Sequence, residues 1–341
     1  MPSQKQYTER IDNIRAIFSA LRECGSLTRN EISQKLGLSW ACVSDLTAML
    51  ISEGIALARS PSGEKSFRGR TPSYLCLSEE NCFLGVDINN NGITFRKESA
   101  AGELIAVHTD KREIDTEDAL SEILLSGIEG MLSGFPGKCL GIGVAMQGQR
   151  SEATGLWGFP APGGYIYVDP EKMIGAKFKI PVTVRHDPEC MLYAFMGNGE
   201  RKDTMTVRVD GGIGVAVMKR GEMLTCPLEL GETVTEGGVH LSELCTTAKI
   251  ISSADKTGAC RALSLAVANL ALLLDVERVI LCGEAVREYL KLGSFFSDIF
   301  SSVCGGKISL SMSEITDAAG GAVSASASNY FFVGGVANGD I

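Results

Sequence analysis

The chain has 341 residues, of which 45% are hydrophobic and 21% are charged, a composition typical of a folded protein with two or three domains. Its N-terminus, MPSQKQYTER, is polar, and its most apolar stretch, residues 262–274, is shorter than the ~20 residues that a membrane-spanning helix needs. These features predict a cytoplasmic protein, without an export signal or a membrane span.

The eleven cysteines are scattered along the chain, and no two of them form a C-x-x-C pair. A structural zinc site is typically marked by C-x-x-C pairs, and lasting disulfides form in oxidising compartments, which proteins with an export signal reach. The sequence therefore predicts reduced thiols, most of them in the core, and no metal site.

Charge is distributed unevenly along the chain. Residues 1–80 carry 10 Lys and Arg against 9 Asp and Glu, whereas residues 81–341 carry 22 against 32. A polyanion such as DNA is repelled by the acidic part, so only the first 80 residues are expected to bind one.

These first 80 residues are predicted to form a winged helix-turn-helix. An amphipathic helix ends near Gly25, and Thr28 with Glu31 forms a T-x-x-E capping box for a second helix. Gly37 ends that helix, and Ser39 caps a third helix that runs to about residue 53. Two helices joined by a short turn with glycine are the helix-turn-helix pattern.

Two strands, residues 55–59 and 73–77, are predicted to flank a basic tip and form the wing. The tip contains Lys65, Arg68 and Arg70, the last within the sequence GRTP, which is narrow, extended and suited to the minor groove. The alternative interpretation of these 80 residues is a three-helix module for protein interaction or dimerisation.

The predicted DNA contacts combine the second and third helices with the wing. The third helix carries no Arg or Lys, so base contacts have to come from polar and aromatic side chains, and affinity mainly from the basic residues around it. The predicted DNA-binding residues are Arg29, Trp40, Ser44, Thr47, Lys65, Arg68 and Arg70.

From residue 81 onward strands and helices alternate, and a strand–turn–strand unit occurs twice, as FLGVDINNNGITF and as TMTVRVDGGIGVAV. This repetition predicts a duplicated α/β fold with a ligand cleft between two lobes. The predicted domains are a DNA-binding head (1–80), a first α/β lobe (81–186) and a second α/β lobe (187–341), whose C-terminal helix is expected to pack back on the first lobe.

With these motifs the chain resembles the ROK family (repressor, open reading frame, kinase) over nearly its whole length. The helix-turn-helix with its G-R-x-P wing resembles the head of the repressor branch, and members without that head are sugar kinases. The resemblance implies an actin-like, hexokinase-like body of two ribonuclease H-like lobes. It also implies a sugar-responsive transcriptional repressor that forms a homodimer or a dimer of dimers.

The nucleotide motifs of the family are degraded in this chain. The phosphate turn D-x-G-G-T keeps its aspartate but has asparagines for both glycines, the turn G-x-G-I-G survives in part, and the adenosine-side G-G keeps one glycine. The residues at these vestigial positions are Asp87, Asn89, Asn90, Gly211, Gly212, Gly214 and Gly283. We therefore expect neither ATP nor Mg²⁺ as a cofactor, and we expect Asn91-Gly92 to form a type I′ hairpin turn that preserves the fold.

The sugar motifs keep their acids. The N-D of the family, whose aspartate is the catalytic base in the kinases, is His186-Asp187, and E-x-G-H is Glu229-Leu230-Gly231-Glu232. The zinc loop C-x-C-G-x-x-G-C-L-E corresponds to TEGGVHLSE, which has lost every cysteine, so no zinc cofactor is expected. The resemblance implies as sugar-binding residues His186, Asp187, Glu229, Glu232, His240 and Glu243.

Carboxylates can accept several hydroxyl hydrogen bonds without any nucleotide, so this set can bind a sugar on its own. Simpler roles are open for the same residues: Asp187 precedes Pro188 at the start of a helix, Glu243 also opens a helix, and the two histidines can be hydrogen-bonded neighbours only.

The sequence thus favours a repressor that binds operator DNA through its head and a sugar or sugar derivative through its body, with no membrane association. One alternative is an active ATP-dependent sugar kinase with a regulatory head, in which Asp187 is the general base. The other is a ligand-free regulator whose body only dimerises.

Overall fold

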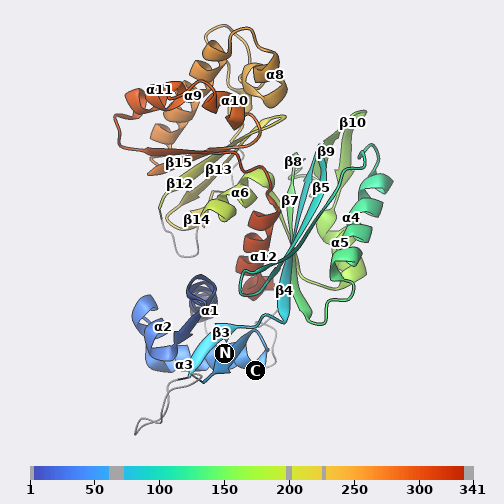
Figure 1. Ribbon diagram of the computed structural model, residues 1–341, viewed down its shortest axis with the longest axis vertical. Helices are drawn as coiled ribbons and strands as arrows, with labels where there is room; N and C mark the ends of the chain where they lie inside the picture. The colour runs from blue at the N-terminus through green and yellow to red at the C-terminus, as the bar shows by residue number, and fades with distance from the viewer. Residues whose placement is uncertain (1–3, 61–72, 197–201, 225–227, 334–341) are drawn as a thin grey trace. The chain divides into compact units, whose positions relative to one another are not determined.

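The computed structural model describes residues 4–60, 73–196, 202–224 and 228–333 (Figure 1). These residues divide into two compact units. The first contains the described residues of 1–185, 196–199 and 322–341, and the second those of 186–195 and 200–321.

The head is a winged helix-turn-helix, as predicted. It consists of α1 (Gln4–Cys24), β1 (Ser26–Thr28), α2 (Arg29–Leu36), α3 (Trp40–Ser52), β2 (Ala56–Arg59) and β3 (Tyr74–Leu77). The predicted wing strands are β2 and β3, which pair antiparallel, and β1, which the sequence did not reveal, pairs with β3 as a third strand. The predicted wing-tip residues Lys65, Arg68 and Arg70 lie outside the described residues.

The local signals that predicted these helices act as expected. The backbone N–H of Thr28 donates to Glu31 Oε2 at 2.7 Å, and the Glu31 N–H donates to Thr28 Oγ1 at 3.2 Å, which completes the capping box. Gly37 ends α2 with φ +68°, in the left-handed conformation that glycine adopts without strain, and Ser39 caps α3.

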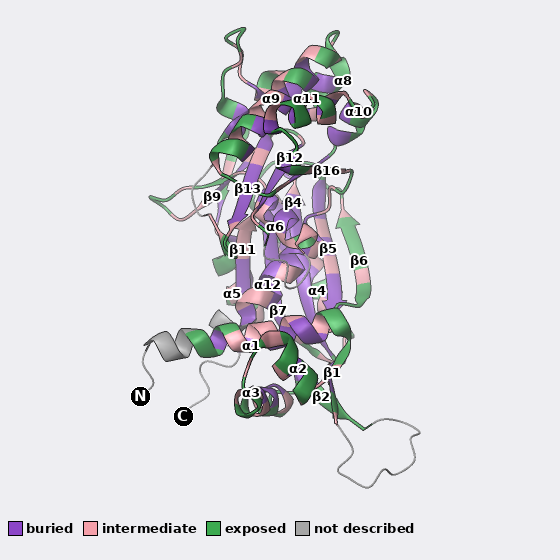
Figure 2. Ribbon diagram, turned by 90° about the vertical axis from the view of Figure 1, so that its left-hand side faces the viewer, coloured by how far each residue is buried: buried purple, intermediate pink, exposed green. Residues whose placement is uncertain are grey.

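The first lobe is built on a five-stranded sheet with the order β11-β7-β4-β5-β6. Its strands and helices are β4 (Asn81–Asn89), β5 (Gly92–Ser99), β6 (Leu104–Asp110), α4 (Glu117–Leu132), β7 (Lys138–Met146), α5 (Pro170–Phe178) and β11 (Val182–His186). Helices α4 and α5 cover one face of this sheet, and α12 (Ala319–Val333) covers the other (Figure 1). The strands β4 and β5 are buried along most of their length, whereas the edge strand β6 is exposed (Figure 2).

A second, three-stranded sheet in this lobe was not predicted. It has the order β10-β9-β8 and comprises β8 (Gln149–Arg150), β9 (Trp157–Ala161) and β10 (Gly164–Val168).

The turn between β4 and β5 differs from the predicted type I′ turn at Asn91-Gly92. Asn89 pairs with Gly92, so the two turn residues are Asn90 and Asn91. A type I′ turn requires positive φ at both turn residues, but the described non-glycine residues with positive φ do not include either of them. Gly92, with φ +122°, supplies the left-handed conformation one position later.

The head packs directly against the first lobe through one continuous apolar core. The Phe83 ring of β4 makes edge-on contacts with Phe18 of α1 at 6.1 Å and with Tyr330 of α12 at 6.0 Å between ring centroids. Beside this core the Arg22 guanidinium pairs with Glu98 Oε2 at 2.5 Å, and Arg96 pairs with Glu98 Oε1 at 2.6 Å. The head is therefore fastened to the lobe by both apolar packing and a buried ion pair.

The second unit contains a five-stranded sheet with the order β14-β13-β12-β15-β16. Its strands are β12 (Thr204–Val209), β13 (Ile213–Lys219), β14 (Glu222–Met223), β15 (Arg278–Cys282) and β16 (Ser309–Ser313). Its helices are α6 (Asp187–Phe195), the 3₁₀ helix η1 (Leu230–Glu232), α7 (Ser242–Cys245), α8 (Thr247–Ser252), α9 (Lys256–Leu273), α10 (Val286–Leu290) and α11 (Phe295–Cys304). No helix of the described residues is long and apolar enough to cross a membrane.

Candidate functional site

Asp187 is the first residue of α6, at the start of the second unit. Its position is set by packing: Pro188 lies against Gly214 at the start of β13, where a Cβ atom would collide with the proline ring. The family glycine at position 214 therefore lets the beginning of α6 approach the strand closely, which holds the Asp187 carboxylate at the end of β12.

The Asp187 carboxylate is engaged by a buried arginine that the sequence analysis did not identify. Arg208 Nη1 lies 3.1 Å from Asp187 Oδ2, and Arg208 Nε lies 2.6 Å from Asp210 Oδ2. On the other side, His186 Nε2 lies 3.3 Å from Asp187 Oδ1. One arginine thus joins the predicted sugar-binding aspartate to the turn after β12.

Burial raises the pKa of Asp187 to about 6, the Arg208 guanidinium opposes this rise, and the Asp210 carboxylate adds to it. Burial lowers the pKa of His186, and the carboxylates of Glu189 and Glu229 oppose that effect. At pH 7 the pair therefore consists of an ionised carboxylate and a neutral imidazole, which together can accept and exchange hydrogen bonds with sugar hydroxyls.

The first vestigial phosphate turn has its polar groups occupied by the protein itself. The Asn90 N–H donates to Gln147 Oε1 at 2.8 Å, and the Asn91 N–H donates to Asn89 Oδ1 at 2.8 Å. The Asn89 amide in turn donates to the buried Asp87 carboxylate at 3.1 Å. Backbone N–H groups that a phosphate would need are thus bound to side chains.

At the second vestigial turn, between β12 and β13, a carboxylate of the turn binds an N–H group of a neighbouring loop. Gly211 and Gly212 are exposed there, but the Asp210 carboxylate accepts the backbone N–H of Glu284 at 2.5 Å. Gly283, with φ +107°, allows this contact, because a Cβ atom at that position would lie 2.6 Å from Asp210 Oδ1. A fixed carboxylate therefore takes an N–H group that could otherwise face an anion, and its charge disfavours a nucleotide.

The remaining predicted sugar-binding residues lie on the segment that includes η1 and α7. Glu229 precedes η1 and is exposed, and its charge acts on His186. His240 Nδ1 lies 2.9 Å from the carbonyl oxygen of Glu232, and the Glu243 N–H donates to the His240 carbonyl at 3.0 Å. The structure thus brings Glu232, His240 and Glu243 together locally, and it connects Glu229 electrostatically to His186.

The segment that corresponds to the zinc loop is held by contacts among its own residues. An isolated bridge joins Val234 to His240, and Thr235 Oγ1 donates to the Val239 carbonyl at 2.9 Å. Within the described ranges no group of three or more His, Cys, Asp or Glu side chains is placed to hold a metal ion.

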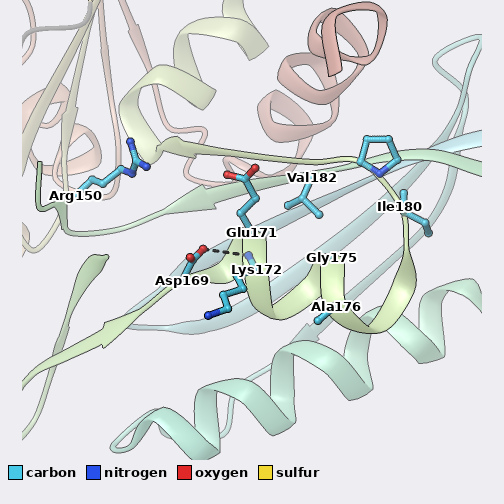
Figure 3. A pocket seen from close by; sticks show the side chains of 9 residues that line it. Arg150, Asp169, Glu171, Lys172, Gly175, Ala176, Ile180 and Val182 are labelled. Atoms are coloured by element: carbon cyan, nitrogen blue, oxygen red, sulfur yellow. Dashed lines mark hydrogen bonds between the residues drawn. The ribbon is translucent and has the colours of Figure 1, made fainter. Parts of the chain in front are cut away.

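A hollow of about 580 Å³ lies in the first unit, at the start of α5 (Figure 3). It contains none of the predicted site residues and carries charges of both signs: Arg150 and Lys172 with Asp169 and Glu171. Asp169 Oδ1 accepts the Lys172 N–H at 3.0 Å and so caps the helix. We attribute no ligand to this hollow, because its best-placed carboxylate already has a structural role.

On the head, the structure separates the predicted DNA contacts of α3. Trp40, at the first position of α3, is 58% exposed, Ser44 is half-buried, and Asp45 pairs with Arg10 of α1 at 2.9 Å. Thr47 is fully buried and accepts a hydrogen bond from Arg29 Nε at 3.0 Å. The expectation that Thr47 contacts DNA is therefore wrong: it orients Arg29 instead.

Known proteins resemble this chain in sequence and in structure. No protein-family model matches the chain. A candidate xylose repressor of Caldicellulosiruptor sp. (strain Rt8B.4) is 24% identical over 211 residues, which are 59% of this chain and 52% of that protein. The match therefore spans about half the length of this curated relative.

Solved structures resemble this chain over a larger part of its length. A ROK family transcriptional regulator, described as a homologue of the E. coli MLC protein, matches with a TM-score of 0.74 at 16% identity, covering 98% of this chain and 100% of that chain. The ROK family glucokinase of Streptomyces griseus, solved with glucose and AMPPNP, matches with a TM-score of 0.57 at 13% identity over 72% and 98%. The ROK hexokinase of Thermus thermophilus matches with 0.59 at 16% identity over 72% and 97%.

The chain therefore has the fold of ROK transcriptional regulators, a winged helix-turn-helix followed by a sugar kinase-like α/β body. The predicted fold class is confirmed, and so is the predicted resemblance to the ROK family and its repressor branch.

Proposed function

We propose that this protein is a sugar-responsive transcriptional repressor that binds operator DNA through its winged helix and a sugar or sugar derivative through its body. We further propose that it acts in the cytoplasm as a homodimer or a dimer of dimers, without a metal or nucleotide cofactor. The relatives support the repressor role, since one is described as a candidate xylose repressor and another as a transcriptional regulator.

The main support for DNA binding is the exposed surface of α3. Trp40 is more than half exposed at the N-terminal end of this helix, where recognition helices contact base edges. Arg29 is held against the same helix by its hydrogen bond to Thr47. The exposed indole of Trp40 is free of the core and is available to contact DNA, for example a thymine methyl group.

The ligand part rests on the buried Asp187 and Arg208 and on the partly exposed His186 beside them. Its carboxylate is ionised at neutral pH and lies beside a neutral imidazole, as hydrogen bonding to hydroxyls requires. We propose as further acceptors Glu229, whose charge acts on His186, and Glu232 and Glu243. A sugar that changes DNA affinity a hundredfold has to prefer one state of the protein by about 2.7 kcal/mol.

Loss of kinase activity is the third part of the proposal. Arg208 holds the candidate general base Asp187 in an ion pair, side chains accept the N–H groups of Asn90 and Asn91 in the first vestigial turn, and Asp210 beside the second accepts the Glu284 N–H. Mg-ATP would have to compete with the contacts at the two turns, which makes phosphoryl transfer the weaker candidate function.

DNA binding is tested by selecting sequences from a random duplex library with the full chain and measuring fluorescence anisotropy at fixed salt. We expect an enriched sequence, and we expect Trp40→Ala to weaken its binding at least tenfold, about 1.4 kcal/mol. Tyr165→Ala is the matched control, since Tyr165 is an aromatic residue of the body that is 65% exposed. No enrichment, or equal losses in both variants, would contradict the proposal.

The ligand and the alternatives are tested together with a panel of hexoses, pentoses and N-acetyl sugars. We expect one sugar class to raise the melting temperature and Mg-ATP to leave it unchanged. ATP-dependent phosphorylation of a sugar that disappears in Asp187→Asn would instead establish the kinase. A panel without any shift would favour the ligand-free dimerising regulator.

A further inference from the structure

Two thiols of the first lobe lie side by side where the head meets the lobe. Cys82 is the second residue of β4 and Cys139 the second residue of β7, and they face each other directly in the parallel pairing of these strands. Neighbouring strands lie about 4.8 Å apart, and a disulfide requires Cα atoms about 4.4–6.8 Å apart. The pairing register shifts next to Cys82, which gives the backbone room to adjust.

We propose that Cys82 and Cys139 form a reversible disulfide when the protein meets a peroxide, so that the junction of head and lobe is a redox-modification site. The chemistry is balanced by one hydrogen peroxide: one thiolate attacks the peroxide, giving a sulfenic acid and hydroxide, and the second thiol then displaces water. Two thiols and one peroxide thus give one disulfide and two waters.

The surroundings of the pair support this reactivity. The hydrogen bond with the Cys139 thiol lowers the pKa of Cys82, burial opposes this, and the nearby Lys97 ammonium lowers it further. Lys97 is itself buried and held by the Met131 carbonyl at 2.6 Å. The same hydrogen bond and burial raise the pKa of Cys139, the half-buried thiol of the pair, so Cys82 is the thiol that supplies the thiolate.

Another pair of cysteines provides a contrast within the same chain. Cys245 and Cys260 interact in the second unit, and burial raises their pKa values to about 11 and about 12. Among the described residues no cationic side chain lowers the pKa of either thiol, whereas Lys97 lowers that of Cys82, so both are expected to stay reduced under conditions that oxidise Cys82 and Cys139.

The position of the pair links it to the head. Asn81, the residue before Cys82, donates from its side chain to the Gly54 carbonyl of the head at 2.7 Å, and its own carbonyl accepts the Ala100 N–H at 2.8 Å. A cross-link at Cys82 fixes the strand that carries this hydrogen bond. We therefore expect the disulfide to restrict opening of the head against the lobe.

Peptide mapping of the full-length Cys76→Ser variant tests the disulfide, because Cys82 and Cys139 are then the only cysteines of tryptic peptides 71–96 and 139–150. With a few equivalents of hydrogen peroxide we expect these peptides to be cross-linked, with a loss of about 2 Da, and to separate again with dithiothreitol. Cys139→Ser should abolish the cross-link, and Cys24→Ser, at an exposed thiol, should not. Free thiols at both positions, or separate sulfinic acids, would overturn the proposal.

Hydrogen exchange over residues 50–56 tests the link to the head. We expect exchange at least about threefold slower in the oxidised than in the reduced protein. Equal exchange in both forms would show that the disulfide does not act on the head.

Discussion

Replacing Glu98 tests how the head is fastened to the body. Glu98 holds both Arg22 of the head and Arg96 of its own strand, and the side chains of Arg22 and Glu98 are only 10% and 8% exposed. Burial lowers the pKa of Arg22, and the Glu98 carboxylate is the main influence that opposes this and favours the charged guanidinium. Gly102 packs against the same guanidinium, where a Cβ would lie 3.0 Å from Arg22 Nε.

In Glu98→Ala the Arg22 guanidinium stays buried without its carboxylate. Removing one partner of a buried ion pair costs about 3–5 kcal/mol. The matched control is Glu129→Ala, which removes an ion pair of the same lobe with Lys177, whose side chains are 65% and 41% exposed. Exposed pairs contribute about 0–1 kcal/mol, so the two variants should differ by several kcal/mol.

Because the chain has two units, a single unfolding curve does not report on the head, and native-state hydrogen exchange of α1 and α2 amides is the suitable measurement. Glu98→Ala should lower the free energy of opening of these amides by about 3 kcal/mol or more. The double variant Arg22→Met with Glu98→Leu should restore most of it, since apolar groups can replace a buried pair. If Glu98→Ala changes the opening free energy no more than Glu129→Ala does, the buried ion pair does not stabilise the head.

Three further predictions concern the cap, the ligand site and the hairpin. Thr28→Ala removes the capping box of α2 and should destabilise the head by about 1 kcal/mol in hydrogen exchange, whereas an unchanged free energy would show that α2 does not depend on its cap. Because the pKa of Asp187 is raised to about 6, its carboxylate protonates as the pH falls, and sugar affinity by calorimetry should drop about tenfold from pH 7 to pH 5. Asp187→Asn should bind weakly at both pH values, and a wild-type affinity independent of pH would exclude Asp187 as the acceptor. Gly92→Ala should destabilise the first lobe by about 1 kcal/mol or more, since its φ is +122° and the Asp110 carbonyl faces it. A melting temperature equal to that of the wild type would contradict that strain.

The head was predictable because its signals are local. Capping box, left-handed glycine and second cap act within a few residues of chain, and each is satisfied where the sequence placed it. Thr47 was misjudged because it was grouped with Trp40 and Ser44 on one helical face. It also follows Val43 by four residues and precedes Leu50 by three, so it shares their buried side.

The contacts that escaped prediction join residues far apart in sequence. β1 is three residues long and pairs with β3 across the whole helix-turn-helix, so no local pattern announces it. Arg208 meets Asp187 only because α6 packs on β13, and its signal in the sequence was a single charge inside the otherwise uncharged strand TMTVRV. The same applies to Cys82 and Cys139, which only the strand pairing brings together.

In the proposed function a sugar, and not a nucleotide, controls DNA binding by the head through the body. The most direct measurement is the anisotropy of the selected DNA duplex bound to the full chain, titrated at fixed salt with the stabilising sugar and, separately, with Mg-ATP. We expect the sugar to change the dissociation constant at least tenfold, about 1.4 kcal/mol, and Mg-ATP to leave it unchanged. A change of the dissociation constant with Mg-ATP, or no change with any sugar that binds, would contradict control by a sugar.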